Sequence, residues 1–288
     1  MKISDMFKKD KIVVSFEIFP PKAQYPVSTI YDTIQSLKVL NPEFISVTYG
    51  AGGSSSATTF EIAKKVKNDY DLETLTHFTC IGASSDEIEN SLEKIKKINV
   101  NNILALRGDS PSNQGDSSLS NSKYRYAKDL VTHIKKNHDF CVGGAAYPEG
   151  HLDCRDLETT IDHLKQKVNC GTDFLITQIF FDNRVYYEFL DKVQKNGIDI
   201  PISVGIMPIL NANQIQRICS LCGASIPSKM QTMIEKYGGN SPDMEKAGIE
   251  YACEQISDLV DHNVDGIHIY TMNKPNQVNI IIKQTGLR

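Results

Sequence analysis

Short apolar runs rich in β-branched residues recur along the chain, and amphipathic stretches of helical periodicity separate them. Several runs are apolar on both faces, which is typical of strands in a parallel sheet buried beneath helices. The pattern predicts eight strands, at Ile12–Phe19, Phe44–Tyr49, Leu75–Cys80, Ile103–Leu106, Phe140–Tyr147, Phe174–Phe181, Ile202–Met207 and Gly266–Tyr270. Ser85–Ile98 and Tyr126–Lys136 are among the predicted helices.

The strand runs follow one another at a regular interval. The first seven begin roughly 30 residues apart, the size of one strand-helix unit, and the eighth follows a helix-rich stretch, Ala224–Asn263. A doubly wound sheet is the alternative, but it normally has a glycine-rich turn after its first strand, where this chain has Pro20-Pro21. We therefore expect an α/β fold, a single-domain (β/α)8 TIM barrel over residues 1–288.

The distribution of charge limits the kinds of molecule that we expect the protein to bind. The 288 residues carry a formal net charge of -4, and the lysines are spread along the chain, so there is no basic tract of the kind that binds nucleic acid. Met1–Lys11 alternates charged and apolar groups and lacks the apolar stretch of a signal peptide or a membrane-spanning helix. We expect a cytoplasmic protein that binds neither nucleic acid nor membranes.

Seven cysteines, an odd number in a long chain without a secretory signal, indicate reduced thiols rather than a disulfide framework. Cys219 and Cys222 form the only C-x-x-C, and no second pair or nearby histidines complete a zinc motif. The surrounding pattern is helical, so we interpret them as two thiols on one helical face and assign no metal.

Polar residues end or interrupt most of the apolar runs. In a barrel of this kind, active sites form at the C-terminal ends of the strands, so these residues are the candidates for function. Most have a structural explanation: a lone strand histidine such as His77 is usually hydrogen-bonded in the core, and Arg107 could pair with Asp109. A carboxylate inside an apolar strand is different, because burying its ionised form is costly unless it is paired. Glu17 is therefore the strongest acid candidate, and we expect its pKa to be raised.

Two loops accompany these strands. The segment from Gly50 to Ser56 follows a strand and precedes a helix, so its amides could cradle a phosphate. Its spacing lacks the third glycine of a dinucleotide signature, which supports a ligand-facing loop and an ordinary turn equally. The segment from Ser112 to Asn121, rich in Ser, Asn and Gly, is predicted to be a mobile loop after the fourth strand.

The opening strand, Ser15–Lys22, closely resembles the first-strand motif of the methylenetetrahydrofolate reductase family. Further matches follow in the family's order across nearly the whole chain. They are Ser46–Ala51, His77–Cys80, Leu106–Asp109, Tyr126–Ala127, Ala146–His151, Ile176–Gln178, Phe180–Asp182, Gly205–Pro208 and Tyr270–Asn273. The resemblance implies a barrel that binds FAD and uses NADH or NADPH to reduce 5,10-methylenetetrahydrofolate to 5-methyltetrahydrofolate, supplying methyl groups for methionine synthesis.

The same resemblance implies a set of cofactor contacts. They are Thr48, Tyr49, Ala51, His77, Arg107, Gly108, Asp109, Tyr126, Ala127, Tyr147, His151, Thr160, His163, Gln166 and Lys167. Thr48 would face the nicotinamide. Arg107, His151 and Lys167 would hold the pyrophosphate and ribityl oxygens of FAD, since cationic or donor side chains suit anions.

The resemblance also implies the chemistry of the folate. Glu17 would protonate N10, which opens the five-membered ring to an electrophilic iminium that accepts hydride. Asp109 would stabilise that cation and anchor the pterin. Gln178 would contact folate and nicotinamide in turn, and Gln214 and Lys274 would help to hold folate. One site used by two substrates in succession implies ping-pong kinetics.

Three positions depart from the family pattern. Thr160 stands where members often have an aspartate in a flavin-contacting helix. Ile218 stands where some carry an aromatic residue, and Lys274 replaces an arginine of some members, which removes bidentate bonding to the folate tail. These departures affect individual contacts rather than the function.

Two other interpretations stay open. Proline dehydrogenase is a related flavin barrel, although Glu17 and Leu106–Asp109 argue against it. A non-catalytic flavin subunit that receives electrons from a partner is not excluded. The sequence decides neither between NADH and NADPH nor whether the chain forms a homo-oligomer. Because it stops at Arg288, we expect none of the regulatory domain that binds S-adenosylmethionine in eukaryotic members.

Overall fold

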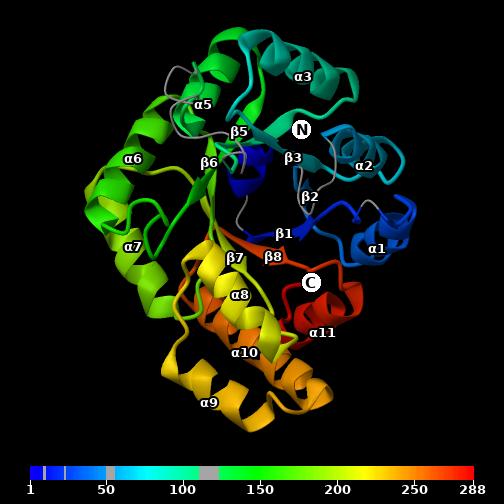
Figure 1. Ribbon diagram of the computed structural model, residues 1–288, viewed down its shortest axis with the longest axis vertical. Coiled ribbons are helices and arrows are strands. Elements are labelled where there is room, and N and C mark those ends of the chain that lie inside the picture. Colours follow the sequence, from blue (N-terminus) through cyan, green and yellow to red (C-terminus); the bar gives the residue numbers. More distant parts are fainter. Residues whose placement is uncertain (9–10, 23, 50–55, 110–122) are drawn as a thin grey trace.

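Eight parallel strands pair in chain order, and β8 pairs with β1, which closes the sheet into a barrel (Figure 1). The structure is a computed structural model that describes residues 1–8, 11–22, 24–49, 56–109 and 123–288. The strands are β1 (Val13–Ile18), β2 (Phe44–Val47), β3 (Thr74–Thr79), β4 (Asn102–Leu106), β5 (Cys141–Ala146), β6 (Phe174–Thr177), β7 (Ile202–Ile206) and β8 (Gly266–Tyr270). The predicted (β/α)8 TIM barrel is confirmed.

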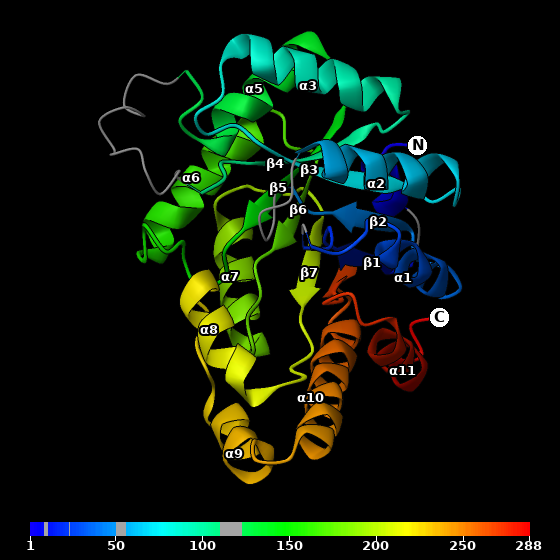
Figure 2. The same ribbon diagram turned by 45° about the vertical axis from the view of Figure 1, so that its right-hand side comes forward.

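Helices cover the outside of this barrel (Figures 1 and 2). They are α1 (Thr29–Lys38), α2 (Ser56–Asn68), α3 (Ser85–Lys97), α5 (Ala127–Asn137), α6 (Leu157–Asn169), α7 (Asn183–Lys195), α8 (Ala212–Cys222), α9 (Ser228–Tyr237), α10 (Ser241–Asp261) and α11 (Pro275–Thr285). Most bury one apolar stripe against the strands, as Ile88, Leu92 and Ile95 do in α3. A capping box between Ser84 and Glu87 begins α3.

The two faces of each strand have different neighbours. In β1, Val14, Phe16 and Ile18 belong to the core between barrel and helices, whereas Val13 belongs to a separate cluster inside the barrel. That inner cluster includes Ile3 and Met6 of a short 3-10 helix, η1 (Ile3–Lys8), which the sequence analysis did not predict. Apolar side chains thus fill the N-terminal end of the barrel, which leaves polar inward side chains at the C-terminal end.

One strand is shorter than its apolar run. The sequence predicts a strand from Phe174 to Phe181, but β6 ends at Thr177. Ile179 and Phe181 are buried in a second core cluster, where they pack with residues of α8, α9 and α10. The apolar run therefore continues past the strand because it enters a different core, a distinction that hydrophobicity alone does not reveal.

The helices α8, α9 and α10 extend as a lobe at the bottom of Figures 1 and 2. Methionines are prominent in its core, including Met230 and Met244. The backbone of α10 lies very close to the loop that follows β7. A Cβ added to Gly248 would overlap the carbonyl oxygen of Ile209. The lobe accounts for the predicted helix-rich stretch, Ala224–Asn263. Within the described ranges, no helix has both the length and the apolar character needed to cross a membrane.

The side chain of Asn273 bridges the seam between β1 and β8 beyond the ends of the strands. Asn273 donates from Nδ2 to the Phe19 carbonyl (2.9 Å), and its Oδ1 accepts from the Phe19 amide (3.2 Å). Met272 and Asn273 both adopt left-handed backbone conformations, with φ of 51° and 54°. This turn directs the amide back across the seam, so the C-terminal ends of the first and last strands are held together.

Candidate active site

A cavity of about 1040 Å³ opens at the C-terminal ends of the strands. Residues from both halves of the chain line it. The predicted site residues in its lining are Glu17, Thr48, Tyr49, His77, Arg107, Gly108, Asp109, Tyr147, His151 and Gln178. Tyr270 and Met272 add the C-terminal end of β8 and the turn after it. The barrel therefore gathers the strand-end residues into one site, as its topology requires.

Glu17 lies in the floor of this cavity between two imidazoles. Its Oε2 is 3.3 Å from His77 Nε2 and 3.6 Å from His268 Nε2. Ser46 Oγ shares a hydrogen bond of 2.7 Å with the same Nε2 of His77, and Ser15 Oγ shares one of 2.7 Å with Nδ1 of His268. The side chain of Glu17 is 16% exposed, so the carboxyl group faces the cavity while histidines and serines surround its base.

The expected raised pKa of Glu17 is wrong for this arrangement. Burial does raise the pKa of the carboxyl, but close contacts from His268 and His77 outweigh that effect and lower it to about 2. The sequence argument correctly placed a carboxylate in a buried strand but lacked the two imidazoles that stabilise its ionised form. Glu17 is therefore ionised at neutral pH in this structure.

His268 is the member of this cluster that sequence reasoning missed. It is fully buried in β8, and its Nε2 has no hydrogen-bond partner within the described part of the chain. The register of β8 against β1 places His268 opposite Ser15, one inward position below Glu17. A histidine inside the apolar run Gly266–Tyr270 was the available signal, but its partner depends on how the last strand meets the first.

Tyr270 forms a fixed wall next to this cluster. Its hydroxyl donates to the Thr177 carbonyl (2.8 Å). Its ring lies against Gly205, where an added Cβ would be 2.7 Å from Tyr270 Cε2. Burial raises the pKa of Tyr270 well above its usual value. The phenol is therefore a neutral, immobilised group in the cavity wall.

Thr48 and Gln178 supply polar groups on two other sides of the cavity. Thr48 Oγ1 is buried and has no hydrogen-bond partner in the ranges that the structure describes. Gln178 Oε1 accepts from the Ile179 amide (2.9 Å), which fixes the side chain at the end of β6. An unpaired buried hydroxyl costs free energy, so Thr48 is suited to a polar ligand.

A second cavity, of about 560 Å³, lies beside the first between the ends of β4 and β5 and the helices α5 and α6. The predicted cofactor residues in its lining are Arg107, Tyr126, Ala127, Tyr147, His151, Thr160, His163, Gln166 and Lys167. Arg107, Tyr147 and His151 line both cavities, which joins them into one elongated site.

Lys167 provides a buried cation in the second cavity. Its Nζ donates to the Ala145 carbonyl, and it forms no ion pair among the residues that the structure describes. Burial lowers the pKa of Lys167 to about 8. A lysine buried without a counter-charge is costly, and a bound anion would offset that cost. The surroundings of Lys167 thus fit the phosphate groups of a nucleotide.

Arg107 stands where the two cavities meet. Its Nη1 donates to Asp153 (2.9 Å), so the ion pair that the structure shows is with Asp153 rather than with Asp109. Nε of Arg107 is buried and unpaired within the described ranges. Asp109 itself is exposed at the cavity edge. The pKa of His151 is lowered, mainly because its side chain is partly buried. Nearby charges, including that of Arg107, have smaller effects.

Two other predicted contact residues hold the walls of the second cavity. Thr160 Oγ1 donates to the Cys154 carbonyl (2.9 Å), which ties α6 to the loop that carries His151. Gln166 Oε1 accepts from Lys128 Nζ (2.7 Å) and so links α6 to α5. Thr160 replaces the family's frequent aspartate with a group that braces the loop.

Several predicted residues lie elsewhere. Gln214 and Lys274 are exposed and belong to the lining of neither cavity, so their folate contacts remain predictions for a substrate that extends beyond the mouth. Ile218 does line the larger cavity. Ala51 and most of the loop from Gly50 to Ser56, like the loop from Ser112 to Asn121, lie outside the described residues.

All seven cysteines are free thiols. Cys219 and Cys222 lie one turn apart on α8, which confirms the interpretation as two thiols of one helix. Burial raises the pKa of both thiols, so they are poor nucleophiles at neutral pH.

Comparison with known proteins decides the family. The family model for methylenetetrahydrofolate reductase matches residues 2–286. The chain belongs to the methylenetetrahydrofolate reductase family. A 5,10-methylenetetrahydrofolate reductase from Escherichia coli is 34% identical over 278 residues, covering 96% of this chain and 92% of the relative. The resemblance inferred from the strand-end motifs is confirmed.

Longer eukaryotic relatives match as well. Methylenetetrahydrofolate reductase 1 from Schizosaccharomyces pombe is 37% identical over 294 residues, which cover 100% of this chain and 49% of the relative. Methylenetetrahydrofolate reductase (NADH) 1 from Arabidopsis thaliana is 32% identical and is covered to 50%. The chain thus spans about half the length of these relatives.

Solved structures share the fold. An uncharacterized protein from Clostridium thermocellum, described as binding two copies of 5-methyl-5,6,7,8-tetrahydrofolic acid, aligns with a TM-score of 0.68 at 16% identity, covering 98% of this chain and 96% of that one. A tryptophan synthase structure from M. tuberculosis aligns with a TM-score of 0.56 at 10% identity, covering 99% and 95%. At these identities the likeness shows the barrel alone.

Proposed function

We propose that the protein is an NAD(P)H-dependent flavoenzyme that reduces 5,10-methylenetetrahydrofolate to 5-methyltetrahydrofolate and so supplies methyl groups for methionine synthesis. The observation that carries the proposal is the joined site: Glu17 in the floor of one cavity and Lys167, a buried cation without an ion pair in the described structure, in the other. Membership of the methylenetetrahydrofolate reductase family supports the same substrate class.

The chain's residues fit FAD. The second cavity offers the buried amine of Lys167 and the unpaired Nε of Arg107 for the pyrophosphate, with Tyr126 at its exposed rim for the adenine. The two cavities have volumes of about 560 and 1040 Å³, within the range of cofactor and ligand sites. When bound, FAD would supply hydride transfer between nicotinamide and folate.

Glu17 is the proposed proton donor to folate N10, although its pKa is lowered to about 2 in the open cavity. That lowering depends on the contacts from His268 and His77. A pterin bound over the cavity would exclude water and raise the pKa of Glu17, so that the carboxyl group takes up a proton before it donates to N10. The histidines position Glu17 in the floor of the cavity.

Other residues of the cavity would orient the substrates. Asp109 at the mouth would stabilise the cationic iminium and hydrogen-bond the pterin. Gln178 would contact folate and nicotinamide in turn and Thr48 would face the nicotinamide, because both residues line the same cavity. A cavity shared by two substrates supports ping-pong kinetics. The relative from Arabidopsis thaliana is named as NADH-dependent, which favours NADH as the donor.

The decisive experiment separates the two half-reactions in the purified yellow holoprotein. Wild type should show bleaching of the flavin absorbance with NADH or NADPH and reoxidation with methylenetetrahydrofolate. Glu17→Gln should keep the bleaching and lose the reoxidation by at least ~100-fold, since general acid catalysis contributes on this scale. A defect confined to the NADH half-reaction would contradict the acid role.

The same assay tests the rival functions. Bleaching by proline without bleaching by NADH or NADPH would indicate a proline dehydrogenase. Failure of both nicotinamides to bleach a flavin-loaded protein would favour a subunit that depends on an electron-delivering partner. Rapid bleaching by NADH in the isolated chain would contradict both alternatives.

A further inference from the structure

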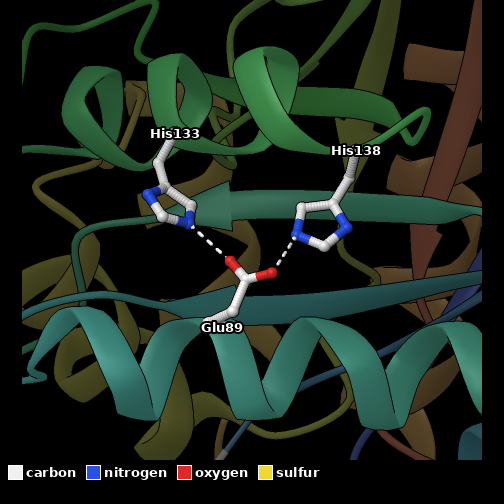
Figure 3. Close-up of side chains that lie close together, drawn as sticks. All are labelled: Glu89, His133 and His138. Carbon is white, nitrogen blue, oxygen red and sulfur yellow. Dashed lines mark hydrogen bonds and ion pairs between the residues drawn. The ribbon is translucent and has the colours of Figure 1, made fainter.

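A cluster of two histidines and a carboxylate lies outside the barrel, between α3 and α5 (Figure 3). Glu89 projects from α3 toward His133 of α5 and His138, the residue that follows this helix. Glu89 Oε2 lies 3.0 Å from His133 Nε2, and Oε1 lies 2.9 Å from His138 Nε2. The three potential ligand atoms all lie within 4.8 Å of one another.

Burial makes this more than a surface ion pair. The side chain of His138 is 5% exposed and that of His133 is 12% exposed, while Glu89 is 46% exposed. His138 Nε2 is buried, and despite its closeness to Glu89 it has no hydrogen bond of acceptable geometry within the described part of the chain. A buried nitrogen that faces a carboxylate without a proper hydrogen bond is suited to a ligand placed between them.

The outer nitrogens of the imidazoles have oxygen partners of their own. His133 Nδ1 shares a hydrogen bond of 2.9 Å with the hydroxyl of Tyr124, and His138 Nδ1 lies 4.0 Å from Glu93 Oε1. When Tyr124 accepts from Nδ1, this hydrogen bond orients the His133 imidazole and favours the tautomer whose Nε2 is free to bind a metal. Both Nε2 atoms already face Glu89.

We propose that Glu89, His133 and His138 bind a divalent transition-metal ion of the zinc type. Two imidazole nitrogens and one carboxylate oxygen form a ligand set that zinc takes in proteins, with water in the fourth position. Four residues separate the histidines, within the spacing that zinc-binding histidine pairs use. The exposed face of Glu89 gives the ion a path from solvent.

The proposed ion would join parts of the fold that are separate in sequence. Glu89 comes from the helix after β3, and the histidines come from the helix after β4 and its C-terminal end. Tyr124, hydrogen-bonded to His133, also lines the second cavity. Metal binding therefore clamps α3 to α5 and fixes one wall of that cavity. The proposal does not depend on the reaction that the barrel performs.

The test is titration of chelator-treated, gel-filtered protein with Zn²⁺ in a calorimeter. Wild type should bind one equivalent, and Glu89→Gln and His133→Gln should each weaken binding at least ~10-fold, because each removes or neutralises one ligand. His262→Gln is the matched control: His262 lies 3.6 Å from the carboxylate of Asp258 but belongs to no such cluster in the described residues. This control should bind Zn²⁺ like wild type.

Co²⁺ in place of Zn²⁺ distinguishes this site from the free thiols. Nitrogen and oxygen ligands give weak visible bands, whereas cysteine ligands add an intense near-ultraviolet charge-transfer band. We expect the weak bands alone, and their loss in Glu89→Gln. This exposed, isosteric change should not disturb folding, which circular dichroism checks. No bound equivalent in wild type, unchanged affinity in Glu89→Gln, or a thiolate band would each overturn the proposal.

Discussion

Glu17 and Lys167 are both charged groups buried at the site, and their surroundings differ. Close contacts from two imidazoles stabilise the ionised Glu17 and lower its pKa to about 2. Lys167 has a single backbone carbonyl as its hydrogen-bond partner, and burial lowers its pKa to about 8. The carboxylate is therefore stabilised by the fold itself, whereas the ammonium is stabilised only when an anion binds.

The Lys167→Met variant should stabilise the ligand-free protein. The folded pKa of about 8 lies below the ordinary value of 10.5, so the charged lysine opposes folding at pH 7 and ceases to do so as the pH rises from 8 to 10.5. The charged lysine lowers the free energy of unfolding by about 3 kcal/mol at pH 7. The variant also loses the hydrogen bond to the Ala145 carbonyl, which reduces its expected gain in stability by about 1 kcal/mol. We expect a gain of about 2 kcal/mol in urea unfolding at pH 7.

The pH dependence provides the check on this variant. Its advantage should shrink between pH 8 and 10.5, because the wild-type lysine then loses its charge. Lys136→Met, at an exposed position of α5, should leave stability within about 0.5 kcal/mol of wild type at every pH. A stability gain that does not depend on pH would mean that packing rather than charge explains the effect.

The His268→Asn variant should raise the pKa of Glu17. The variant removes the first of the two contacts that lower the pKa, while burial, which raises it, remains. Asparagine keeps a polar group near Ser15. We expect an increase of at least about 1 pH unit, measured by difference infrared spectroscopy of the carboxyl band. The stabilisation from ionised Glu17, present above pH 4.5 and lost toward pH 2 in wild type, should then be lost at higher pH.

An unchanged carboxyl titration in a folded His268→Asn protein would show that His77 alone sets the pKa. At this scale the sequence predicted that Glu17 and His77 share a site, because strand ends meet in a barrel. It did not predict the lowered pKa. That value depends on His268, whose side chain reaches Glu17 only through the β1–β8 register.

At the scale of single elements, α10 shows packing overriding helix propensity. Alanine is about 1 kcal/mol better than glycine inside a helix. The backbone of Gly248, however, lies so close to the Ile209 carbonyl that no Cβ can be accommodated without movement. The glycine is needed for the close approach of helix and loop rather than for a turn.

Gly248→Ala should therefore destabilise the protein by about 1–3 kcal/mol, since α10 must move away from the loop after β7. Urea unfolding measures the change. Gly239→Ala is the control, because an added Cβ there meets nothing within 4 Å, and it should change stability by less than about 0.5 kcal/mol. A stabilising Gly248→Ala would show that helix propensity dominates and that the close approach is readily relieved.

The apolar runs predicted every strand but not every boundary. Periodicity locates β1 to β8 because each strand buries both faces. Periodicity wrongly extended β6 to Phe181. The residues beyond Thr177 are apolar because they pack into the core of the α8–α10 lobe, not because they continue the strand. Which core an apolar residue joins is a property of the assembled molecule.

For the whole molecule, the joined cavities predict strong coupling between cofactor binding and stability. FAD at about 100 times its dissociation constant should add about 2.7 kcal/mol to the free energy of unfolding, provided that it binds only the folded state. Lys167→Met should bind FAD at least ~10-fold more weakly and lose most of this gain, while Lys136→Met should retain it. Equilibrium dialysis and thermal unfolding measure the two quantities; equal FAD affinity in all three proteins would contradict the assignment of Lys167.

The order of the strands around the barrel could be predicted, because successive strand-helix units place each strand next to the one before it. The division of the site into two cavities could not. It depends on how far α5 and α6 stand from the ends of β4 and β5, which is a property of the packed molecule.

The β1–β8 seam has a consequence for synthesis of the protein. Until the segment that carries β8 and Asn273 leaves the ribosome, a nascent chain has two open sheet edges, at β1 and β7. Open edges pair readily with other chains, so the growing polypeptide is prone to aggregate until β8 has emerged and paired with both neighbours. Glu17 of β1 must likewise wait for His268 of β8 before its contacts are complete.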